Sequence, residues 1–569
     1  MQSIRVFASS RMGAKTLQPT PASRLRSLPI YHSYCLSSTL SHTQTAGSTV
    51  DPETKADKER IVILGSGWGG FTLSRRLSRS KFSTTVVSPR SYFVFTPLLT
   101  DSAVGTLNFS EIVEPVRDRK SQVHFIQAAA RAVDFQRKVV TCEASIIRSG
   151  VTESARVDES EREFDEGPEI GPFRGKESLR KWETGQIFDV PYDKLVIAVG
   201  CVTRTFNVPG VRENAMFLKD VGDARRVKRR VRECFELAVM PATKPEMRRH
   251  LLHFAIVGGG PTGTELAAAI CDFIHEDIVK IYPKIREDIR ITLYDVAPRV
   301  LSMFDESLSK YAMEIMKREG VTVKTNHHIQ SLRWGEPNKE PHGEMDPKGC
   351  LTLTTKEEGE VGAGICVWTT GNEMNKFVNR ALGDLESFPE SSAMIRGSAG
   401  SHTQVEQAGK SRWHVSKAPK TGAILVDNHL HVLLKSDDDR IAVMRDVFAL
   451  GDNCMIETGS PPATAQATNQ EARWLAARLN QGNIDTAPGF SFRNLGMLAY
   501  LGDSKALMQL PHDSANGSKD IFPSSITGRT AWLIWKAAYL SMSLSWKNRL
   551  RILISWFSSW AFGRDISRY

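Results

Sequence analysis

Two strand–glycine turn–helix–strand segments and a basic, tryptophan-rich C-terminus predict an α/β fold with two Rossmann-like domains and a C-terminal amphipathic helical element. The first segment covers residues 60–87 and the second covers residues 253–295. In each segment an apolar strand runs into a G-x-G-x-x-G turn, and a helix-like stretch and a second strand follow. A single glycine turn is weak evidence, but two correctly flanked copies predict two dinucleotide sites in one chain.

Charge is concentrated at the two ends of the chain. Of the 569 residues, the first 50 contain five basic side chains, 16 Ser or Thr and no acid, whereas residues 529–569 contain seven basic side chains and one Asp. The body between them is close to neutral, which argues against a nucleic-acid-binding protein. An Arg-rich, Ser-rich and acid-free start predicts a mitochondrial transit peptide over residues 1–50. No run of 18 apolar, uncharged residues occurs, so we expect any membrane contact to be peripheral.

The first glycine turn follows the strand at residues 60–64. Gly65 permits the tight turn, Gly67 lets the backbone approach a pyrophosphate, and Gly70 lets the helix pack closely on the strand. The strand after the helix ends at Ser88 and Arg90 without an acid. We therefore expect Ser88 or Arg90 to contact the ribose of this dinucleotide.

The second turn repeats the pattern with Gly258, Gly260 and Gly263. Its return strand ends at Asp295, where a carboxylate can accept hydrogen bonds from an adenosine ribose and would repel a 2′-phosphate. The second site is therefore predicted to prefer NADH to NADPH.

Short strands that end in glycine follow each unit, at residues 194–200, 366–371 and 447–452. In flavoenzymes with two dinucleotide sites, FAD usually occupies the first site, and an Asp after a late strand reaches the ribityl chain. Gly451 and Asp452 fit that position, so FAD is predicted in the first site. Two polar stretches, residues 148–186 and 384–420, lack periodic apolar residues and are expected to be surface loops.

A family resemblance becomes specific over several motifs in a fixed order. They are residues 65–69, 88–99, 257–265, 368–372, 449–453, 461–470 and 498–502. Together they resemble the type II (alternative, rotenone-insensitive) NADH:ubiquinone oxidoreductases of fungal mitochondria, in the internal, matrix-facing form. The resemblance covers residues 58–569 and implies hydride transfer from NADH to non-covalently bound FAD, then electron transfer to ubiquinone without proton pumping.

The resemblance also implies roles for individual residues. Glu265 matches a Glu near the nicotinamide and the flavin, and Gln466 and Gln470 match glutamines of the quinone pocket. Asn469 falls where related enzymes can have His, and its part in quinone contact is less defined. The dinucleotide-binding residues are expected to be Gly65, Gly67, Trp68, Gly69, Gly70, Ser88, Arg90, Thr96, Gly258, Gly260, Pro261, Thr262, Gly263, Asp295, Gly371, Asn372, Gly451, Asp452 and Ala465.

The last forty residues are predicted to lie on a membrane surface. They contain five of the eleven tryptophans, and apolar residues recur at spacings of three and four beside Lys547, Arg549 and Arg551. Basic, aromatic amphipathic helices bind in the interface of anionic membranes. Packing of this region on the body of the protein or on a second subunit, as in a homodimer, is the alternative.

The predicted divisions of the whole chain are 1–50 (transit peptide), 58–215 and 371–500 (FAD, with the quinone segment 461–470), 216–370 (NADH) and 501–569 (membrane anchor and dimer contact).

The sequence also bears on three alternative functions. A disulfide reductase needs a Cys pair after the first glycine turn, and no Cys lies between residues 36 and 141. A sulfide:quinone-type reductase is kept open by Cys201 and Cys366, and a flavoprotein acting through partners, like apoptosis-inducing factor, is the non-enzyme alternative. No metal site is expected. Without a hydrophobic segment after the presequence or a calcium loop, we expect a peripheral position on the matrix side of the inner membrane.

Overall fold

The computed structural model describes residues 58–118, 121–145, 185–340, 349–385, 387–396, 411–511, 525–542, 545–564 and 566. The predicted transit peptide (residues 1–50) and most of the expected loop at 148–186 lie outside the described residues. All elements described here belong to one unit, Gly47–Tyr569.

The first glycine segment forms the centre of a large mixed sheet. β1 (Glu59–Leu64) pairs in parallel with β2 (Phe82–Val87) and with β9 (Lys194–Ile197). Residues 61–64 are fully buried because both faces of this parallel region are covered. The sheet continues beyond β9 and β2 through β24 (Ile441–Ala449), β23 (His431–Ser436), β21 (Trp413–Val415), β19 (Asp384–Leu385) and, at the other edge, β5 (His124–Ile126).

The expectation of a loop over residues 384–420 is wrong for the described part of that stretch. β19 and β21 join the large sheet, and β20 (Ala393–Ile395) pairs with β24. Trp413 is among the largest fully buried side chains of the protein. The three strands have only two or three residues each, too few for an alternating pattern to show in the sequence.

The second glycine segment forms a separate four-stranded parallel sheet. Its strands follow the order β13 (Val321–Lys324), β12 (Arg290–Tyr294), β11 (His253–Val257) and β17 (Ile365–Trp368). The two strands predicted within residues 253–295, one before the glycine turn and one after the helix, therefore agree with β11 and β12. A two-stranded ribbon of β10 (Cys201–Thr203) and β18 (Asn372–Met374) joins the chain segments of the two sheets.

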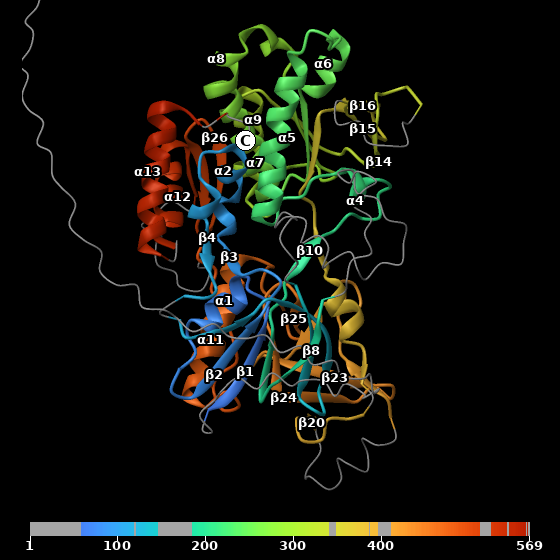
Figure 1. Ribbon diagram of the computed structural model, residues 1–569, viewed down its shortest axis with the longest axis vertical. Helices are drawn as coiled ribbons and strands as arrows, with labels where there is room; N and C mark the ends of the chain where they lie inside the picture. Colours follow the sequence, from blue (N-terminus) through green and yellow to red (C-terminus); the bar gives the residue numbers. More distant parts are fainter. Residues whose placement is uncertain are drawn as a thin grey trace, which may run out of the picture. The chain divides into compact units, whose positions relative to one another are not determined.

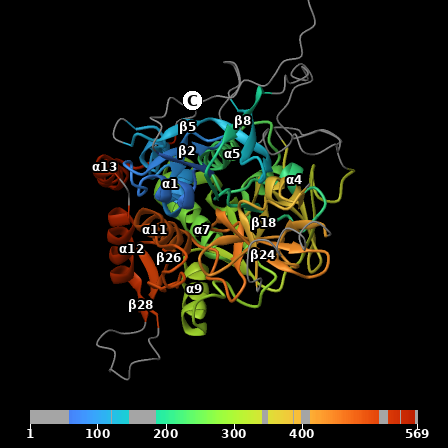
Figure 2. The same cartoon turned by 90° about the horizontal axis from the view of Figure 1, so that it is seen from below.

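Helices and small sheets surround these two sheets (Figures 1 and 2). α1 (Trp68–Ser74) and α11 (Ala465–Gln481) pack together beside the first sheet, and α5 (Val221–Ala238) packs against α2 (Leu99–Val104). The other longer helices are α6 (Pro245–Leu251), α7 (Pro261–Phe273) and α9 (Glu306–Arg318). Two further sheets each have three antiparallel strands. One consists of β6 (Ala128–Asp134), β7 (Val139–Ala144) and β8 (Ile187–Pro191). The other consists of β14 (Ile329–Trp334), β15 (Leu351–Thr355) and β16 (Gly359–Ala363).

The C-terminal region is a small antiparallel sheet followed by two helices. Its elements are β26 (Met497–Gly502), β27 (Lys505–Gln509), β28 (Ser525–Thr527), α12 (Gly528–Met542) and α13 (Trp546–Phe562). α12 packs on β27 and next to α13, and both helices are drawn in red in Figures 1 and 2. Within the described ranges, no helix combines the length and the apolar content that crossing a bilayer requires.

Candidate functional site

The first glycine turn has one open position and two close approaches. Gly65 has a φ of +106°, and a Cβ there would overlap the backbone of Ala198. A Cβ on Gly70 would overlap the carbonyl oxygen of Gly65, so the start of α1 can lie directly on β1. At Gly67, in contrast, an added Cβ meets no atom within 4 Å. The turn is therefore a glycine cradle, a tight backbone loop with free space in front of its central glycine.

The second turn has the same three properties. Gly258 has a φ of +115°, a Cβ on Gly263 would overlap the carbonyl oxygen of Gly258, and Gly260 has open space in front of it. Gly260 is the N-cap residue of the 13-residue helix α7, and Pro261 and Thr262 begin that helix. Free N–H groups at a helix N-terminus favour an anion. Both cradles therefore fit the pyrophosphate of a dinucleotide.

Asp295 lies beside the second cradle, at the end of β12. Its carboxylate accepts hydrogen bonds from the backbone N–H of Gly259 and from that of Ala297, the latter at 2.7 Å. These bonds fix the carboxylate next to the glycine turn and leave oxygen lone pairs for a further donor.

Ser88 and Arg90 lie in different environments at the end of β2. The Ser88 hydroxyl is buried and lies 2.9 Å from the Ser66 hydroxyl, inside the first cradle. Arg90 forms an ion pair of 3.1 Å with Asp220, the N-cap residue of α5. Nearby, the Trp68 indole N–H donates to the Thr96 hydroxyl at 3.0 Å.

Gly451 and Asp452 follow β24 and lie against α11. The Gly451 N–H donates to the Glu471 carboxylate at 2.7 Å, and Glu471 is buried. Burial raises the pKa of Glu471 to about 7, the Gly451 N–H opposes the shift, and the nearby Asp452 adds to it. Sequence reasoning missed Glu471, which directly follows Gln470, the last residue of a motif that carries the resemblance. It also missed Asn453, which is fully buried and binds the backbone of Gly200 and Ile197.

The three predicted quinone residues point in two directions from α11, whose first residue is Ala465. The side chains of Gln466 and Gln470 hydrogen-bond to the backbone of residues 493–496. The Asn469 amide instead donates to the Thr72 hydroxyl on α1 at 3.1 Å. Gln466 and Gln470 are therefore brought together on one face, and Asn469 is not part of that face.

Glu265 is buried in the second turn of α7, where it contacts the C-terminal region. Its carboxylate accepts the Tyr500 backbone N–H at 3.2 Å. Burial raises the pKa of Glu265 to about 8, and the charge of the nearby Asp101 adds to the shift, while the Tyr500 N–H opposes it. A carboxyl that is largely protonated near neutral pH can donate as well as accept a proton.

Gly371 and Asn372 lie in the ribbon that joins the two sheets. Gly371 has a φ of +61°, and the Asn372 side-chain oxygen accepts the Lys219 ammonium at 2.8 Å. Lys219 also contacts the Cys201 sulfur at 3.3 Å, and Cys201 donates to Asp452 at 3.3 Å. Polar contacts therefore connect the ribbon to the late-strand turn of the first sheet.

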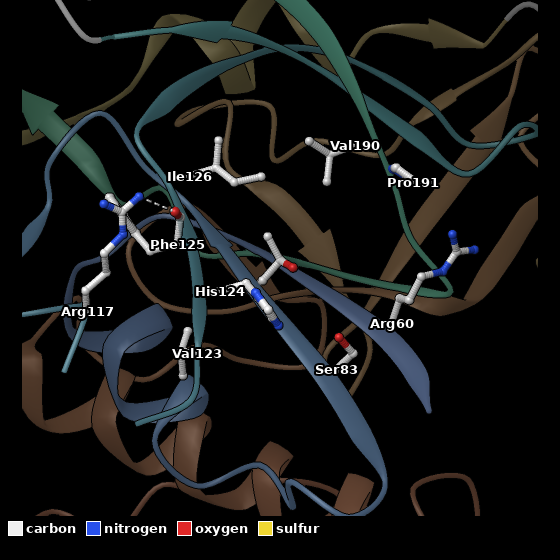
Figure 3. Close-up of a pocket in the computed structure, with 10 residues that line it drawn as sticks. Arg60, Ser83, Arg117, Val123, His124, Phe125, Ile126, Val190 and Pro191 are labelled. Carbon is white, nitrogen blue, oxygen red and sulfur yellow. Dashed lines mark hydrogen bonds between the residues drawn. The ribbon is translucent and has the colours of Figure 1, made fainter. Parts of the chain in front are cut away.

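A cavity of about 370 Å³ lies away from both cradles (Figure 3). Arg60 and Ser83, the second residues of β1 and β2, line it together with Thr85 and with residues of β5 and β8 such as His124 and Val190. Because dinucleotides bind at the carboxyl ends of parallel strands, this cavity is at the wrong end of the sheet for FAD. The Arg117 guanidinium at its rim donates to the Phe125 carbonyl at 2.8 Å.

Comparisons with known proteins agree with this geometry. The family described as pyridine nucleotide-disulphide oxidoreductase matches residues 59–385, and the family described as NDH2 C-terminal domain matches residues 494–565. An external alternative NAD(P)H-ubiquinone oxidoreductase B1 of Solanum tuberosum mitochondria is 31% identical over 91% of each chain. An internal alternative NAD(P)H-ubiquinone oxidoreductase A1 of the same plant is 31% identical over 90% of this chain and 89% of its own.

A solved structure gives the same fold. NDH2 from Plasmodium falciparum in complex with NADH superposes with a TM-score of 0.66 at 22% identity, covering 90% of this chain and all of that one. The relatives include internal and external enzymes at equal identity, so the predicted internal, fungal form stays a prediction. The sequence identity over nearly the whole length and the two family matches show that the chain belongs to the type II (alternative) NADH:ubiquinone oxidoreductase family.

Proposed function

We propose that the protein is an FAD-dependent NADH:ubiquinone oxidoreductase of the mitochondrial respiratory chain that does not pump protons. The observation that carries the proposal is the pair of equivalent glycine cradles, with open space at Gly67 and at Gly260. A chain with one dinucleotide cofactor needs one cradle, whereas transfer from NADH to FAD needs two. When bound, FAD accepts a hydride from NADH and passes two electrons to ubiquinone, which is chemistry that no side chain supplies.

The chain's own residues hold the two dinucleotides in different ways. We assign FAD to the first cradle, with Ser88 and Asp452 beside it, and NADH to the second, with Asp295 at the adenosine ribose. The second assignment favours NADH over NADPH, because the Asp295 carboxylate would lie next to the 2′-phosphate. Comparable turnover with NADPH would contradict that preference.

Quinone reduction consumes protons, and Glu265 is placed to hold one. It is buried at the junction of α7 with β26, and its pKa of about 8 keeps it largely protonated at neutral pH. We assign it to the neighbourhood of the nicotinamide and the flavin. The N-terminus of α11, capped by Thr464, adds partial positive charge next to Gly451 and would stabilise negative charge that develops there.

We infer that α13 holds the enzyme on the anionic surface of the mitochondrial inner membrane. Large apolar side chains on its outer face are exposed, with Trp546, Trp560 and Phe562 each more than three-quarters exposed. Lys547, Arg549 and Arg551 lie on the same helix. Each basic residue near an anionic surface contributes about 1 kcal/mol, and buried aromatic surface adds to that attraction.

A matrix position and a homodimer complete the proposal. The matrix side is tested by protease treatment of intact mitoplasts, which should leave the protein undigested if it faces the matrix. The homodimer is supported by Leu533 and Met542 of α12, which are also exposed. Sedimentation of the detergent-solubilised enzyme as a monomer would contradict it.

Purified holoenzyme tests the proposed reaction directly. NADH should reduce a short-chain ubiquinone with a 1:1 stoichiometry, and sulfide should support no reduction. Sulfide-dependent turnover without NADH-dependent turnover would instead favour the sulfide:quinone reading. Two observations argue against that alternative. Cys366 is fully buried in β17, and burial raises the pKa of the Cys201 thiol, which lies 3.3 Å from Asp452, to about 11, so neither sulfur is a ready thiolate.

A further inference from the structure

Asp101 is a buried acid to which the proposed reaction assigns no role. It lies in the first turn of α2, and only 8% of the residue is exposed. Its carboxylate accepts the indole N–H of Trp556, on α13, at 3.3 Å. One neutral donor compensates only part of the cost of burying a negative charge, so positive charge is expected close by.

Lys536 of α12 supplies that positive charge. Its ammonium lies over the ring of Trp556, 4.7 Å from the centroid, and over the ring of Trp532, at 4.3 Å. Trp556 therefore presents its N–H to Asp101 and the face of its ring to Lys536. A cation on that face attracts ring electrons, which makes the indole N–H a stronger donor. The charge of Lys536 lowers the pKa of Asp101, whereas burial, the larger effect, raises it.

Glu265 is the second buried carboxyl in this region, and its partners are different. It lies on α7, which packs against α2. Burial raises its pKa, and the negative charge of Asp101 raises it further. The Tyr500 backbone N–H donates to it at 3.2 Å, and no Lys or Arg among the described residues forms an ion pair with it.

Two neighbouring buried carboxyls do not both ionise at neutral pH, so such a pair holds one proton over a wide pH range. The cations decide which member holds it. Lys536 and Arg564 both favour the ionised form of Asp101. The negative charge is therefore expected on Asp101, and the proton is expected on Glu265.

The other titratable groups around the pair come from three elements. Burial keeps Tyr500 of β26 and Tyr539 of α12 neutral, because it raises the pKa of both phenols. Asp272 of α7 accepts the Tyr500 hydroxyl at 2.6 Å. Glu276 adds negative charge near Lys536 and raises the pKa of its ammonium. None of these groups places a cation beside Glu265.

We propose that Asp101 and Glu265 form an interacting carboxyl pair that stores one proton on Glu265, and that Asp101, with Lys536 across the ring of Trp556, is the positioning residue for that proton. When Glu265 gives its proton to the reduced quinone, its own O–H bond breaks and an O–H bond forms on the quinone oxygen. Repulsion between the two carboxylates then favours uptake of the next proton from water. This inference rests on the proposed role of Glu265.

Infrared titration of the holoenzyme tests the pair without reference to activity. The carbonyl band of protonated Glu265 is isolated by subtracting the spectrum of the same protein carrying Glu265→Gln. In the Asp101→Asn background this band should disappear about one pH unit or more below its wild-type midpoint, because the neighbouring negative charge is gone. An unchanged midpoint would overturn the pair.

Substitutions at Lys536 should act in the opposite direction. Lys536→Met keeps an unbranched chain between the two indoles but loses the charge, so the band should persist to a pH about half a unit or more above the wild-type midpoint. Lys536→Arg keeps the charge and should titrate as the wild type does. A fall in the midpoint of Lys536→Met would overturn the assignment of the charge to Asp101. This variant also decides the question if Asp101→Asn yields no flavin-containing protein.

Asp272→Asn is the matched control. Asp272 is a buried acid on the same helix as Glu265 and contacts the same tyrosine. It should leave the midpoint of the Glu265 band unchanged. Equal shifts in Asp272→Asn and Asp101→Asn would overturn a specific pairing, because any buried acid of this junction would then have the same effect.

Kinetics connect the pair with turnover. The alkaline limb of the pH profile of kcat/KM for ubiquinone should move to lower pH in Asp101→Asn by the same amount as the infrared midpoint. NADH:ferricyanide reduction, in which the acceptor takes up no proton, should keep its wild-type profile. An infrared shift without a kinetic shift would overturn the role in the reaction. If the wild type reduces no quinone, the proposed function fails, and infrared titration alone still decides whether the pair exists.

Discussion

Each nucleotide cradle contains two glycines with opposite surroundings, and the surroundings indicate different roles for them. Gly70 and Gly263 face the carbonyl oxygen of the first glycine of their own turn, so a larger residue would clash inside the protein itself. Gly67 and Gly260 face open space and have negative φ values, which any residue can adopt. The first pair is needed for packing, and the second pair is needed for a ligand.

Gly260→Ala tests this separation. Because the added methyl meets no protein atom, the free energy of unfolding should stay within about 1 kcal/mol of the wild type, and FAD content should be unchanged. The methyl would occupy the space of the pyrophosphate, so the KM for NADH should rise at least about tenfold. Thermal unfolding, flavin absorbance and steady-state kinetics measure these quantities. Gly263→Ala is the contrasting variant and should lose stability; equal KM values in Gly260→Ala and the wild type would contradict the assignment.

The raised pKa of Glu265 predicts how the free energy of unfolding changes with pH. Its value in the folded protein is about 8, against 4.5 for an ordinary Glu. Between these two pH values the folded state binds the proton more tightly than the unfolded state, so the free energy of unfolding falls as pH rises across that window. Glu265→Gln cannot ionise but keeps an oxygen that accepts the Tyr500 N–H.

The two proteins should therefore have similar stability at pH 5, and the variant should be more stable by pH 8.5, by an amount on the order of a few kcal/mol. Thermal unfolding across that pH range measures the difference. Asp272 and Glu471 also have raised pKa values, of about 6 and 7, and contribute the same slope to both proteins. A difference that does not grow with pH would show that Glu265 is ionised in the folded protein at neutral pH.

Arg564 fastens the end of α13 to the half of the protein that contains the second glycine cradle, to which we assign NADH. Its guanidinium pairs with Asp277 at 2.7 Å and with Glu276 at 2.7 Å, and its Nε donates to the Thr106 hydroxyl at 2.9 Å. Both Arg564 and Asp277 expose only about a tenth of their side chains. Removing one partner of a buried ion pair leaves the other charge desolvated.

Arg564→Ala should therefore lower the free energy of unfolding by about 3 kcal/mol. Arg551→Ala, an exposed arginine on the same helix, is the matched control and should change stability by no more than about 0.5 kcal/mol. Chemical denaturation of the holoenzymes compares the two. Equal losses would mean that the charge of the tail, and not the buried pair, stabilises the protein.

The C-terminal region contacts both halves of the protein, at α7 in one half and at α11 in the other. α7, which begins at the second glycine cradle, holds β26 through Glu265 and through Asp272, which accepts the Tyr500 hydroxyl at 2.6 Å. α11 of the other half holds the preceding segment through Gln466 and Gln470. The helices that we place on the membrane are therefore tied to both nucleotide-binding halves.

Substitutions of exposed side chains on α13 test whether this helix binds the membrane. Ile554→Glu and Trp560→Glu replace side chains that are 58% and 82% exposed on α13. Each should weaken binding to vesicles of anionic phospholipid by about tenfold or more, since burial of such a side chain contributes about 2 kcal/mol and the new charge is repelled. Met240→Glu, between α5 and α6, is the control, because Met240 is 56% exposed but lies outside the C-terminal region. Equal binding of all three in a flotation assay would place the membrane contact elsewhere.

The two glycine cradles and the strands that lead into them were predictable from the order of residues alone. A positive φ at Gly65 or Gly258 and a close approach at Gly70 or Gly263 are local demands that only glycine meets, so they are visible as a motif. The amphipathic C-terminal helices were predictable for the same reason, since their spacing is local. The short strands between residues 384 and 415 were not, because two or three residues carry no period.

The directions of the polar side chains at the site could not be predicted, because they depend on contacts between segments that are far apart in the chain. The Glu265 carboxylate accepts the Tyr500 N–H, the Glu471 carboxylate accepts the Gly451 N–H, and the Gln466 amide oxygen accepts the Leu495 N–H. These partners are 235, 20 and 29 residues apart, and the hydrogen bonds between them depend on how α7 and α11 pack against the C-terminal region. A residue's type and spacing show that it can make a hydrogen bond, but the folded chain selects its partner, because a buried polar group must take whichever complementary group the packing brings within reach.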